Sequence, residues 1–509
     1  MHDEGLPPAG EPDPGPGAGT NPLLWAVNLI SDPIHGYIEL TKRMTPEHAA
    51  RLGMGPETAA EGDLLDSAWL QRMRRISQLQ SARWAFPTAE HSRFTHSLGV
   101  MHEAGLWARH LYPSLRAEIL DAAPEVEPPS EGLVVETMRL AGLLHDVGHG
   151  PLAHFFDEHV LHRFPSPVDP RRPDKSLTHE DLSQLIVERE LGPLIRSIRR
   201  APGSDAGRDA LRRDESIDPR WISFLISKPP IVDPGMPIWL RWLQPLLSGV
   251  FTVDNLDYVR RDSYMIGVST GPVDVERLRR YSFIGPRGLT LYEQGLGALE
   301  MFLAARLFMY QQIYFHRTVR AIDLDLAAVF RPSVEALFGD ESPADHLARY
   351  ADLDEYALLH QAALWARGEA LSAEPRPGDG TVTPEVGRAW RAILLRRPNW
   401  RLEAEVRRSY EASERDDAIA AARAELGGFP GAVGRGSPAA TDPASGVAID
   451  MAEIDARPSE ATAVDATLAV VGRNGLPAAP VSRSLSRLPA YALVARRYRR
   501  VASGTGGDG

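Results

Sequence analysis

The sequence of 509 residues contains no cysteine, which excludes disulfide bonds, a thiolate nucleophile and a cysteine metal site. Lysine is also scarce, since only Lys42, Lys175 and Lys228 occur among the 56 basic residues. The net charge of −12 gives the whole chain no electrostatic reason to bind nucleic acid or an anionic membrane. A negatively charged substrate would therefore need a local basic site.

Long apolar runs are absent as well. The best candidate, residues 238–251, is interrupted by Arg241, Gln244 and Pro245, whereas a membrane span needs roughly 20 apolar residues. Residues 1–20 are acidic and rich in glycine and proline, unlike a secretion signal. We therefore expect a cytoplasmic protein without a membrane segment.

The chain is longer than one compact core usually requires, so we expect a large domain with smaller additions. The composition and the apolar periodicity predict a mainly α fold with small β additions and a small C-terminal α/β unit. The predicted parts are a disordered tail (1–20), a core (21–330), a helical extension (331–427), a flexible loop or linker (428–445), a C-terminal unit (446–503) and a tail (504–509).

The stretch 145–157 concentrates groups that can bind a metal, with three histidines and two aspartates. The apolar run before it predicts a buried helix that carries the adjacent His145 and Asp146 inward at its end. Such a pair can bind one metal ion. Two glycines then allow a sharp turn that would return His149 and His154 toward that ion.

Several other segments have sequence patterns that predict a strand, a helix cap or a helix. Residues 32–40 predict a short strand or hairpin, and Thr178 is a candidate N-cap. Apolar spacing predicts helices over 66–80, from about 91 to 111, over 250–268 and over 297–326, and a charged helical region over 340–427 broken near 375–383.

The pattern His-Asp-x-Gly-His-Gly-Pro-x-x-His-x-x-Asp over 145–157 resembles the HD phosphohydrolase superfamily, and in particular its branch of deoxynucleoside triphosphate triphosphohydrolases. Two further motifs support the resemblance: Asp-Pro-Ile-His-Gly from Asp32, and Arg-Phe-x-His-Ser-Leu-Gly-Val from Arg93. The resemblance extends from about Leu29 to Arg320. It implies an HD-domain helical core and hydrolysis of a deoxynucleoside triphosphate to deoxynucleoside and tripolyphosphate.

The same resemblance implies the metal ligands, which are His96, His145, Asp146 and Asp254. This mixed nitrogen and oxygen set suits Mn, Fe, Zn or Mg and does not choose among them; a second Mg would accompany the triphosphate.

Hydrolysis of the triphosphate also requires a group that gives a proton to the leaving oxygen of the deoxynucleoside. His154 and Asp157 lie three positions apart, which makes His154 the candidate general acid, oriented by Asp157. His149 and His179 would hold phosphate oxygens or support that acid.

Substrate contacts are implied residue by residue. Gln78 and Asp262 would meet the 3′-hydroxyl, and Leu79 and Tyr314 would leave no space for a 2′-hydroxyl. The predicted phosphate contacts are Arg93, Tyr258 and Arg306.

Two residues depart from the family pattern. Asn255 replaces a phosphate-contacting lysine of the animal members, and Phe315 replaces a glutamine beside the sugar and base. Loss of this cation would weaken the affinity for a triphosphate or shift the preferred substrate.

Asp66, Gln71 and Arg74 have two interpretations. They form an ordinary polar helix face, or they match a site between subunits where the animal enzymes recognise an activating guanine nucleotide. The second interpretation implies a homo-oligomer.

Two other functions remain open from the sequence. One is an HD phosphohydrolase for another nucleotide, such as a monophosphate or a guanosine polyphosphate. The other is a nucleotide-binding regulator with little turnover.

Overall fold

The computed structural model describes residues 26–51, 59–168, 174–203, 206–227, 235–427, 440–442, 445–456, 468–478, 485 and 487–501. The tails predicted at 1–20 and 504–509 lie outside the described residues, as does most of the predicted linker at 428–445.

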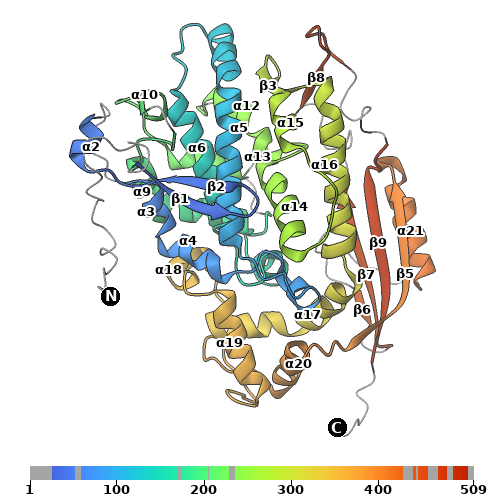
Figure 1. Cartoon of the computed structure of the whole chain (residues 1–509). Helices are drawn as coiled ribbons and strands as arrows, with labels where there is room; N and C mark the ends of the chain where they lie inside the picture. Colours follow the sequence, from blue (N-terminus) through green and yellow to red (C-terminus); the bar gives the residue numbers. More distant parts are fainter. Residues whose placement is uncertain are drawn as a thin grey trace, which may run out of the picture.

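A helical core makes up most of the described molecule (Figure 1). Its longest helix, α5 (Arg93–Ala122), packs along α6 (Glu131–Leu144) and also against α14 (Val253–Ile266). The prediction of a mainly α fold is confirmed.

Helix α6 is buried from Gly132 to Leu144, as its apolar run predicts. It begins at Ser130, whose side chain accepts a hydrogen bond from the backbone N–H of Leu133. A Cβ atom at Gly142 would lie only 2.8 Å from the carbonyl oxygen of Val100 on α5. Glycine at this position therefore lets the two helix backbones approach closely, which brings the end of α6 near the first turns of α5.

The other elements complete the chain in order. They are β1 (Val27–Asp32), β2 (Gly36–Thr41), α2 (Pro46–Arg51), α3 (Glu61–Leu65), α4 (Ala68–Arg72), η1 (Met73–Arg75), η2 (Gln80–Trp84), α7 (His154–His159), η3 (Leu161–Arg163), α8 (His179–Leu185), η4 (Ile186–Glu190), α9 (Gly192–Ser197), α10 (Ala206–Asp209), α11 (Pro219–Ser227), α12 (Ile238–Leu243), α13 (Pro245–Ser248), α15 (Val275–Arg280), β3 (Ser282–Gly285), β4 (Gly288–Tyr292), η5 (Glu293–Gly295), α16 (Leu296–Met309), η6 (Tyr310–Tyr314), α17 (Arg317–Phe338), η7 (Pro343–Asp345), α18 (Leu347–Tyr350), α19 (Glu355–Ala366), α20 (Pro384–Leu394), β5 (Trp400–Tyr410), η8 (Ala412–Glu414), α21 (Arg415–Glu425), β6 (Ala440–Asp442), β7 (Val447–Asp455), β8 (Ala469–Val471) and β9 (Tyr491–Arg500).

The hairpin predicted at 32–40 is confirmed. Strands β1 and β2 pair antiparallel, with Ile30 opposite Ile38. The carboxylate of Asp32 accepts hydrogen bonds from the backbone N–H groups of Ile34 and His35, which fixes the turn.

The helix predicted over 66–80 is wrong beyond Arg75. Helix α4 and the 3₁₀ turn η1 end there, and Ile76 is extended. Ser77 then forms a β-bridge with Ser92, and its N–H donates to the carboxylate of Glu355. These tertiary hydrogen bonds replace the helical ones that the apolar spacing suggested.

The single helix predicted over 297–326 is also wrong, because two helices meet there. Helix α16 ends in the π-helical turn η6, and α17 begins after His316. The side chain of His316 caps the new helix by accepting from the N–H of Thr318. A π-turn of this kind widens the helix and turns its side chains.

The region 340–427 is not purely helical as predicted, since it contains strand β5. This strand pairs with β9 in a four-stranded sheet of order β5-β9-β7-β6. Helix α21 covers one face, where Ile419 and Leu426 pack against the sheet. The other face packs against α16 and η6 through Phe315 and neighbouring residues. The sheet therefore packs against α16 and η6, and these elements carry predicted substrate contacts (Figure 1).

None of the described helices is long and apolar enough to cross a bilayer.

Candidate functional site

The four predicted metal ligands come together from three helices. His96 lies on the first turns of α5, His145 and Asp146 follow the end of α6, and Asp254 lies in the first turn of α14. The Nε2 atom of His96 is 3.2 Å from Oδ1 of Asp254 and 3.9 Å from Oδ2 of Asp146. The Nε2 atom of His145 is 3.3 Å from Asp146 and 3.8 Å from Asp254.

The hydrogen bonds of the two histidines leave these nitrogens available for a metal. The Nδ1 atom of His145 pairs with the carbonyl oxygen of Gly142 at 2.8 Å, while its buried Nε2 has no hydrogen-bond partner. The Nδ1 atom of His96 pairs with Asp257, so its Nε2 also faces the carboxylates. Two imidazole nitrogens and two carboxylates suit a divalent metal, and the ligand atoms of His96, His145 and Asp146 lie within 4.8 Å of one another.

The charges in this group are strongly coupled. Burial opposes ionisation of Asp146, but His145 and Arg93 hold the pKa of its carboxyl well below its usual value. Burial alone would lower the pKa of His96, whereas hydrogen bonds with Asp254 and Asp257 raise it to about 10. Burial also opposes ionisation of Asp254, but His96 and His145 lower the pKa of its carboxyl. Both ligand carboxylates are therefore in the ionised form that a metal ligand requires, and His96 would lose its proton when a metal binds.

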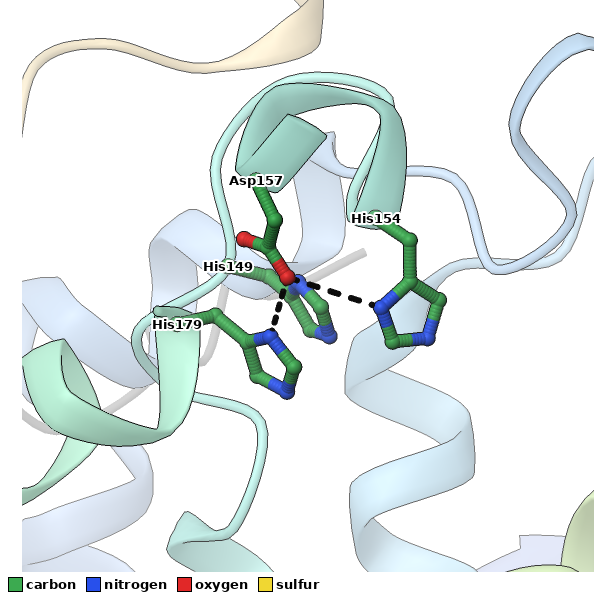
Figure 2. Close-up of side chains that lie close together, drawn as sticks. All are labelled: His149, His154, Asp157 and His179. Atoms are coloured by element: carbon green, nitrogen blue, oxygen red, sulfur yellow. Dashed lines mark hydrogen bonds and ion pairs between the residues drawn. The ribbon is translucent and has the colours of Figure 1, made fainter. Parts of the chain in front are cut away.

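A second cluster adjoins the first and contains His149, His154, Asp157 and His179 (Figure 2). In Figure 2 the carboxylate of Asp157 lies between the rings of His179 and His154. It is hydrogen-bonded to Nδ1 of His179, and it lies 3.6 Å from Nδ1 of His154. His149 stacks on His179 with ring centroids 3.7 Å apart. The predicted pairing of His154 with Asp157 is thus shared with His179.

Burial and neighbouring charges shift the pKa values of His149 and His179 in opposite directions. Burial, with Arg93 and His179, lowers the pKa of His149 well below its usual value, which keeps this ring neutral. Burial would lower the pKa of His179, but the Asp157 carboxylate raises it. His154 differs from both, because 59% of its side chain is exposed. It is the member of the cluster that a ligand can reach most easily.

The loop before α7 has a strained backbone. Leu152 and Ala153 have φ angles of 58° and 51°, which are unfavourable for residues with a Cβ atom. The buried carboxylate of Glu355 accepts from the N–H of Leu152 as well as from that of Ser77. This carboxylate therefore ties the strained loop that presents His154 to the segment that carries Gln78.

Two more side chains hold the same loop, and one of them comes from the region after residue 340. The guanidinium of Arg72 donates to the carbonyl oxygens of His149 and Leu353, and the hydroxyl of Tyr350 donates to that of Gly148. The sequence offered no local signal for Glu355 or Tyr350, because each bonds to residues about two hundred positions away.

A cavity of about 350 Å³ opens beside the second cluster. It is lined by eight of the predicted site residues: Gln78, Leu79, Arg93, His154, Asp157, Tyr258, Asp262 and Tyr314. Arg93 connects this cavity to the metal ligands, because it lines the cavity and forms an ion pair with Asp146.

A hydrogen-bonded group lies on one wall of the cavity. The hydroxyl of Tyr314 donates to Oδ2 of Asp262 at 2.6 Å, and His91 bonds the other oxygen at 2.8 Å. His91 was not among the predicted site residues. The buried Oε1 of Gln78 has no hydrogen-bond partner, so this wall has an unused acceptor.

Arg306 lies deeper than expected. Its Nε is 3.2 Å from the hydroxyl of Tyr258, and its NH1 donates to the backbone carbonyl of Asp455 at the end of β7. The C-terminal sheet thus positions the guanidinium that was predicted to meet phosphate.

Both departures from the family pattern have structural roles here. The side chain of Asn255 accepts from the N–H of Thr252 and completes the capping box of α14. Phe315 is 1% exposed and packs against Ala452 and Val494 of the C-terminal sheet. The side chain of Asn255 is thus used in the cap, whereas Phe315 also lines the cavity described above.

Asp66, Gln71 and Arg74 lie at the surface or partly buried. Arg74 donates to the side-chain oxygen of Gln71 at 2.8 Å, and its guanidinium stacks on the ring of Phe94. Asp66 is the C-cap residue of α3.

Comparison with known families agrees with this geometry. Residues 93–216 match the HD domain, and residues 273–370 match the HD associated region. The chain therefore contains an HD domain and, after it, an HD associated region. The first match begins at Arg93 and includes three of the four predicted ligands, which confirms the resemblance seen in the sequence. An HD domain implies a metal-dependent hydrolase.

Curated relatives are similar at low identity. The uncharacterized protein YwfO of Bacillus subtilis is 27% identical over 360 residues, covering 68% of each chain. The deoxynucleoside triphosphate triphosphohydrolase SAMHD1 homolog of Dictyostelium discoideum is 27% identical over 59% of this chain and 48% of its own length. Human SAMHD1, of the same description, is 25% identical over 60% of this chain and 44% of its own. The HD-domain chain therefore spans less than half of these two triphosphohydrolases.

Solved structures show the same fold. A hypothetical protein from Aquifex aeolicus has a TM-score of 0.60 and 22% identity, with 93% of this chain and 96% of that chain covered. A phosphohydrolase from Bacteroides thetaiotaomicron has a TM-score of 0.57 and 18% identity, with 93% and 100% covered.

Proposed function

We propose that this HD-domain protein hydrolyses deoxynucleoside triphosphates to deoxynucleoside and tripolyphosphate. The observation that carries the proposal is the cavity itself, which is lined both by the His154–Asp157 pair with Arg93 and by a second group formed by Gln78, Asp262 and Tyr314. One end offers groups that bind and protonate a phosphate ester, and the wall offers acceptors and an aromatic ring for a sugar.

His96, His145, Asp146 and Asp254 would hold one divalent metal, whether Mn, Fe, Zn or Mg. Such a metal, when bound, polarises a phosphoryl oxygen and lowers the pKa of water. The chain itself binds the anion through Arg93, whose guanidinium lines the cavity. A second Mg would enter with the triphosphate.

His154 would give a proton to the leaving 5′-oxygen. It lines the cavity, and the Asp157 carboxylate lies 3.6 Å from its Nδ1, where it can orient the ring. His179 would hold Asp157 in place, and the neutral His149 would contact a phosphate oxygen. Tyr258 and Arg306, which bond each other, would form a further phosphate contact.

The sugar would lie against the wall opposite. The unused buried oxygen of Gln78 would accept from a 3′-hydroxyl. Asp262, whose carboxylate also bonds His91 and Tyr314, would be the second acceptor. Leu79, which is 6% exposed, and Tyr314 would occupy the space of a 2′-hydroxyl. Ribonucleotides should therefore be poor substrates, because the buried wall cannot accommodate the extra oxygen.

The regulatory site is a separate part of the proposal. A guanine nucleotide would bind Asp66, Gln71 and Arg74, since a carboxylate accepts from guanine N–H groups and an arginine donates to its oxygen. Binding there would favour an active homo-oligomer through a difference in affinity between states. Activity and mass with and without GTP, in the wild type and in Asp66→Ala, test this part. If neither quantity responds to GTP in the wild type, the three residues are an ordinary surface.

The main proposal is tested by product identity. The purified protein is incubated with each dNTP and NTP in the presence of Mn or Mg, and the products are separated by ion exchange. Deoxynucleoside and tripolyphosphate support the proposal. Orthophosphate or pyrophosphate indicates an HD phosphohydrolase for another nucleotide, and absence of turnover with retained nucleotide binding indicates a regulator.

A further inference from the structure

The second cluster has polar atoms that its own contacts do not use. The Oδ2 atom of Asp157 bonds His179, but its buried Oδ1 has no hydrogen-bond partner among the described residues. His149 is 0% exposed, and neither of its ring nitrogens has such a partner, although Nε2 lies 3.4 Å from Oδ1 of Asp146. Three buried polar atoms without a hydrogen bond lower the stability of the fold unless a ligand satisfies them. The cluster is therefore a candidate for a ligand of its own.

The donor atoms of this cluster suit a transition metal. One ligand atom from each of the four residues lies within 4.8 Å of the other three. A Zn²⁺ ion with bonds of about 2.0 Å needs its four ligand atoms about 3.3 Å apart, so the cluster has to contract by at most about 1.5 Å. Three imidazoles and one carboxylate favour Zn²⁺, Ni²⁺ or Cu²⁺, whereas Mg²⁺ prefers oxygen ligands.

His154 is the member of the cluster that is free to make this contraction. Its side chain is 59% exposed, whereas those of Asp157 and His179 are 8% and 14% exposed. Its Nδ1 is already 3.6 Å from Oδ2 of Asp157, and Figure 2 shows the ring turned toward that carboxylate. Because His154 also lines the cavity, an ion from solvent has a path to the three buried ligands.

We propose that His149, His154, Asp157 and His179 bind a divalent transition-metal ion such as Zn²⁺, at a site separate from the four predicted catalytic ligands. Binding releases the proton that Asp157 and His179 share and requires His154 to move. The site is therefore weaker than the first one, and it fills when metal is added rather than in the protein as prepared.

A bound ion would also inhibit the enzyme. A ring that ligates the ion is neutral, so His154 no longer has the proton that it gives to the leaving oxygen. Excess Zn²⁺ should therefore stop dNTP hydrolysis even when the first site is occupied. This consequence rests on the proposed function, whereas binding of the ion does not.

The test measures zinc bound per chain by metal analysis after equilibrium dialysis against added Zn²⁺, with circular dichroism to establish that each variant is folded. The wild type should bind two equivalents, and Mg²⁺ should not displace the second. Asp254→Ala, which lacks a ligand of the first site, and His154→Ala/His179→Ala, which lacks two of the second, should each bind one. The control is His162→Ala, which removes an exposed histidine of the same cavity and should still bind two.

His154→Ala alone is a milder variant, because the side chain that it removes is largely exposed. Its affinity for the second equivalent should fall at least about tenfold, as expected for loss of a ligand. In kinetics with Mn²⁺, added Zn²⁺ should reduce kcat of the wild type and of His162→Ala over the concentration range in which the second equivalent binds.

Each result supports or overturns a stated part. A single equivalent in the wild type overturns the inference, and so does a second equivalent that persists in His154→Ala/His179→Ala, because that ion lies elsewhere. Turnover that is unchanged with the second equivalent bound refutes the inhibition. If the second equivalent binds and is lost in the variant, but the wild type hydrolyses no dNTP with any metal, the zinc site stands and the proposed function fails.

Discussion

The Nδ1 atom of His96 lies 2.9 Å from Oδ2 of Asp257, and the other oxygen of the same carboxylate lies 2.7 Å from Nε2 of His35. Arg261 bonds both oxygens and also pairs with Asp32. One buried carboxylate therefore links a predicted metal ligand to the N-terminal hairpin. It orients the ring of His96 so that its other nitrogen points to Asp146 and Asp254.

Replacement of Asp257 by asparagine should weaken metal binding. The amide cannot supply the charge that orients and polarises the imidazole, and loss of such an outer partner typically costs about 10- to 100-fold in metal affinity. Competition with a chromogenic chelator measures the affinity directly, without reference to turnover. Asp121→Asn, at an exposed position on α5, is the control. Unchanged affinity in Asp257→Asn would show that the contact with His96 is not used.

Replacement of His154 by alanine should reduce kcat by about 10² to 10⁴, the usual contribution of a general acid. The metal content should stay at the wild-type level, because none of the four predicted ligands is altered. Steady-state kinetics and metal analysis of the same preparation separate the two effects. His360→Ala, at an exposed position on α19, should behave as the wild type. An unaltered kcat in His154→Ala would remove the proposed acid.

Replacement of Glu355 by alanine should release the strained loop. The N–H groups of Ser77 and Leu152 would both lose their acceptor, which should cost roughly 1–3 kcal/mol in the free energy of unfolding. Turnover should fall as well, since His154 follows the positive-φ residues directly. Urea unfolding and kcat measure both effects. Glu369→Ala, where the side chain is paired only at the surface, is the control, and equal stabilities of the two variants would contradict the account.

A pH effect should come from His102. Burial, together with His35 and Arg139, lowers its pKa to about 3. The unfolded chain takes up this proton near pH 6.5, whereas the folded chain does not, so stability should decrease as the pH falls below 6.5. The melting temperature between pH 7 and pH 4.5 measures the decrease, and His102→Gln should make it smaller. If the melting temperature of the variant decreases with pH as steeply as that of the wild type, other groups cause the pH dependence.

The sequence predicted the centre of the site well because its signals are local. The apolar run before His145 correctly predicted a buried helix that ends beside His145 and Asp146, and the motif around it correctly predicted an HD domain. The hairpin at 32–40 and the cap at Thr178 were also correct, since each depends on a few neighbouring residues.

Long-range contacts explain what the sequence did not reveal. The helix expected over 66–80 ends early because Ser77 bonds to Ser92 and Glu355. Strand β5 was missed because its pattern of exposed charges satisfies a helix as well as an edge strand.

The most direct measurement is a single turnover of a dNTP in water enriched in ¹⁸O, followed by mass analysis of every product. The account predicts one ¹⁸O atom in tripolyphosphate and none in the deoxynucleoside, because water attacks the α-phosphorus and His154 protonates the departing 5′-oxygen. Label in orthophosphate or pyrophosphate, or in the deoxynucleoside, would contradict it.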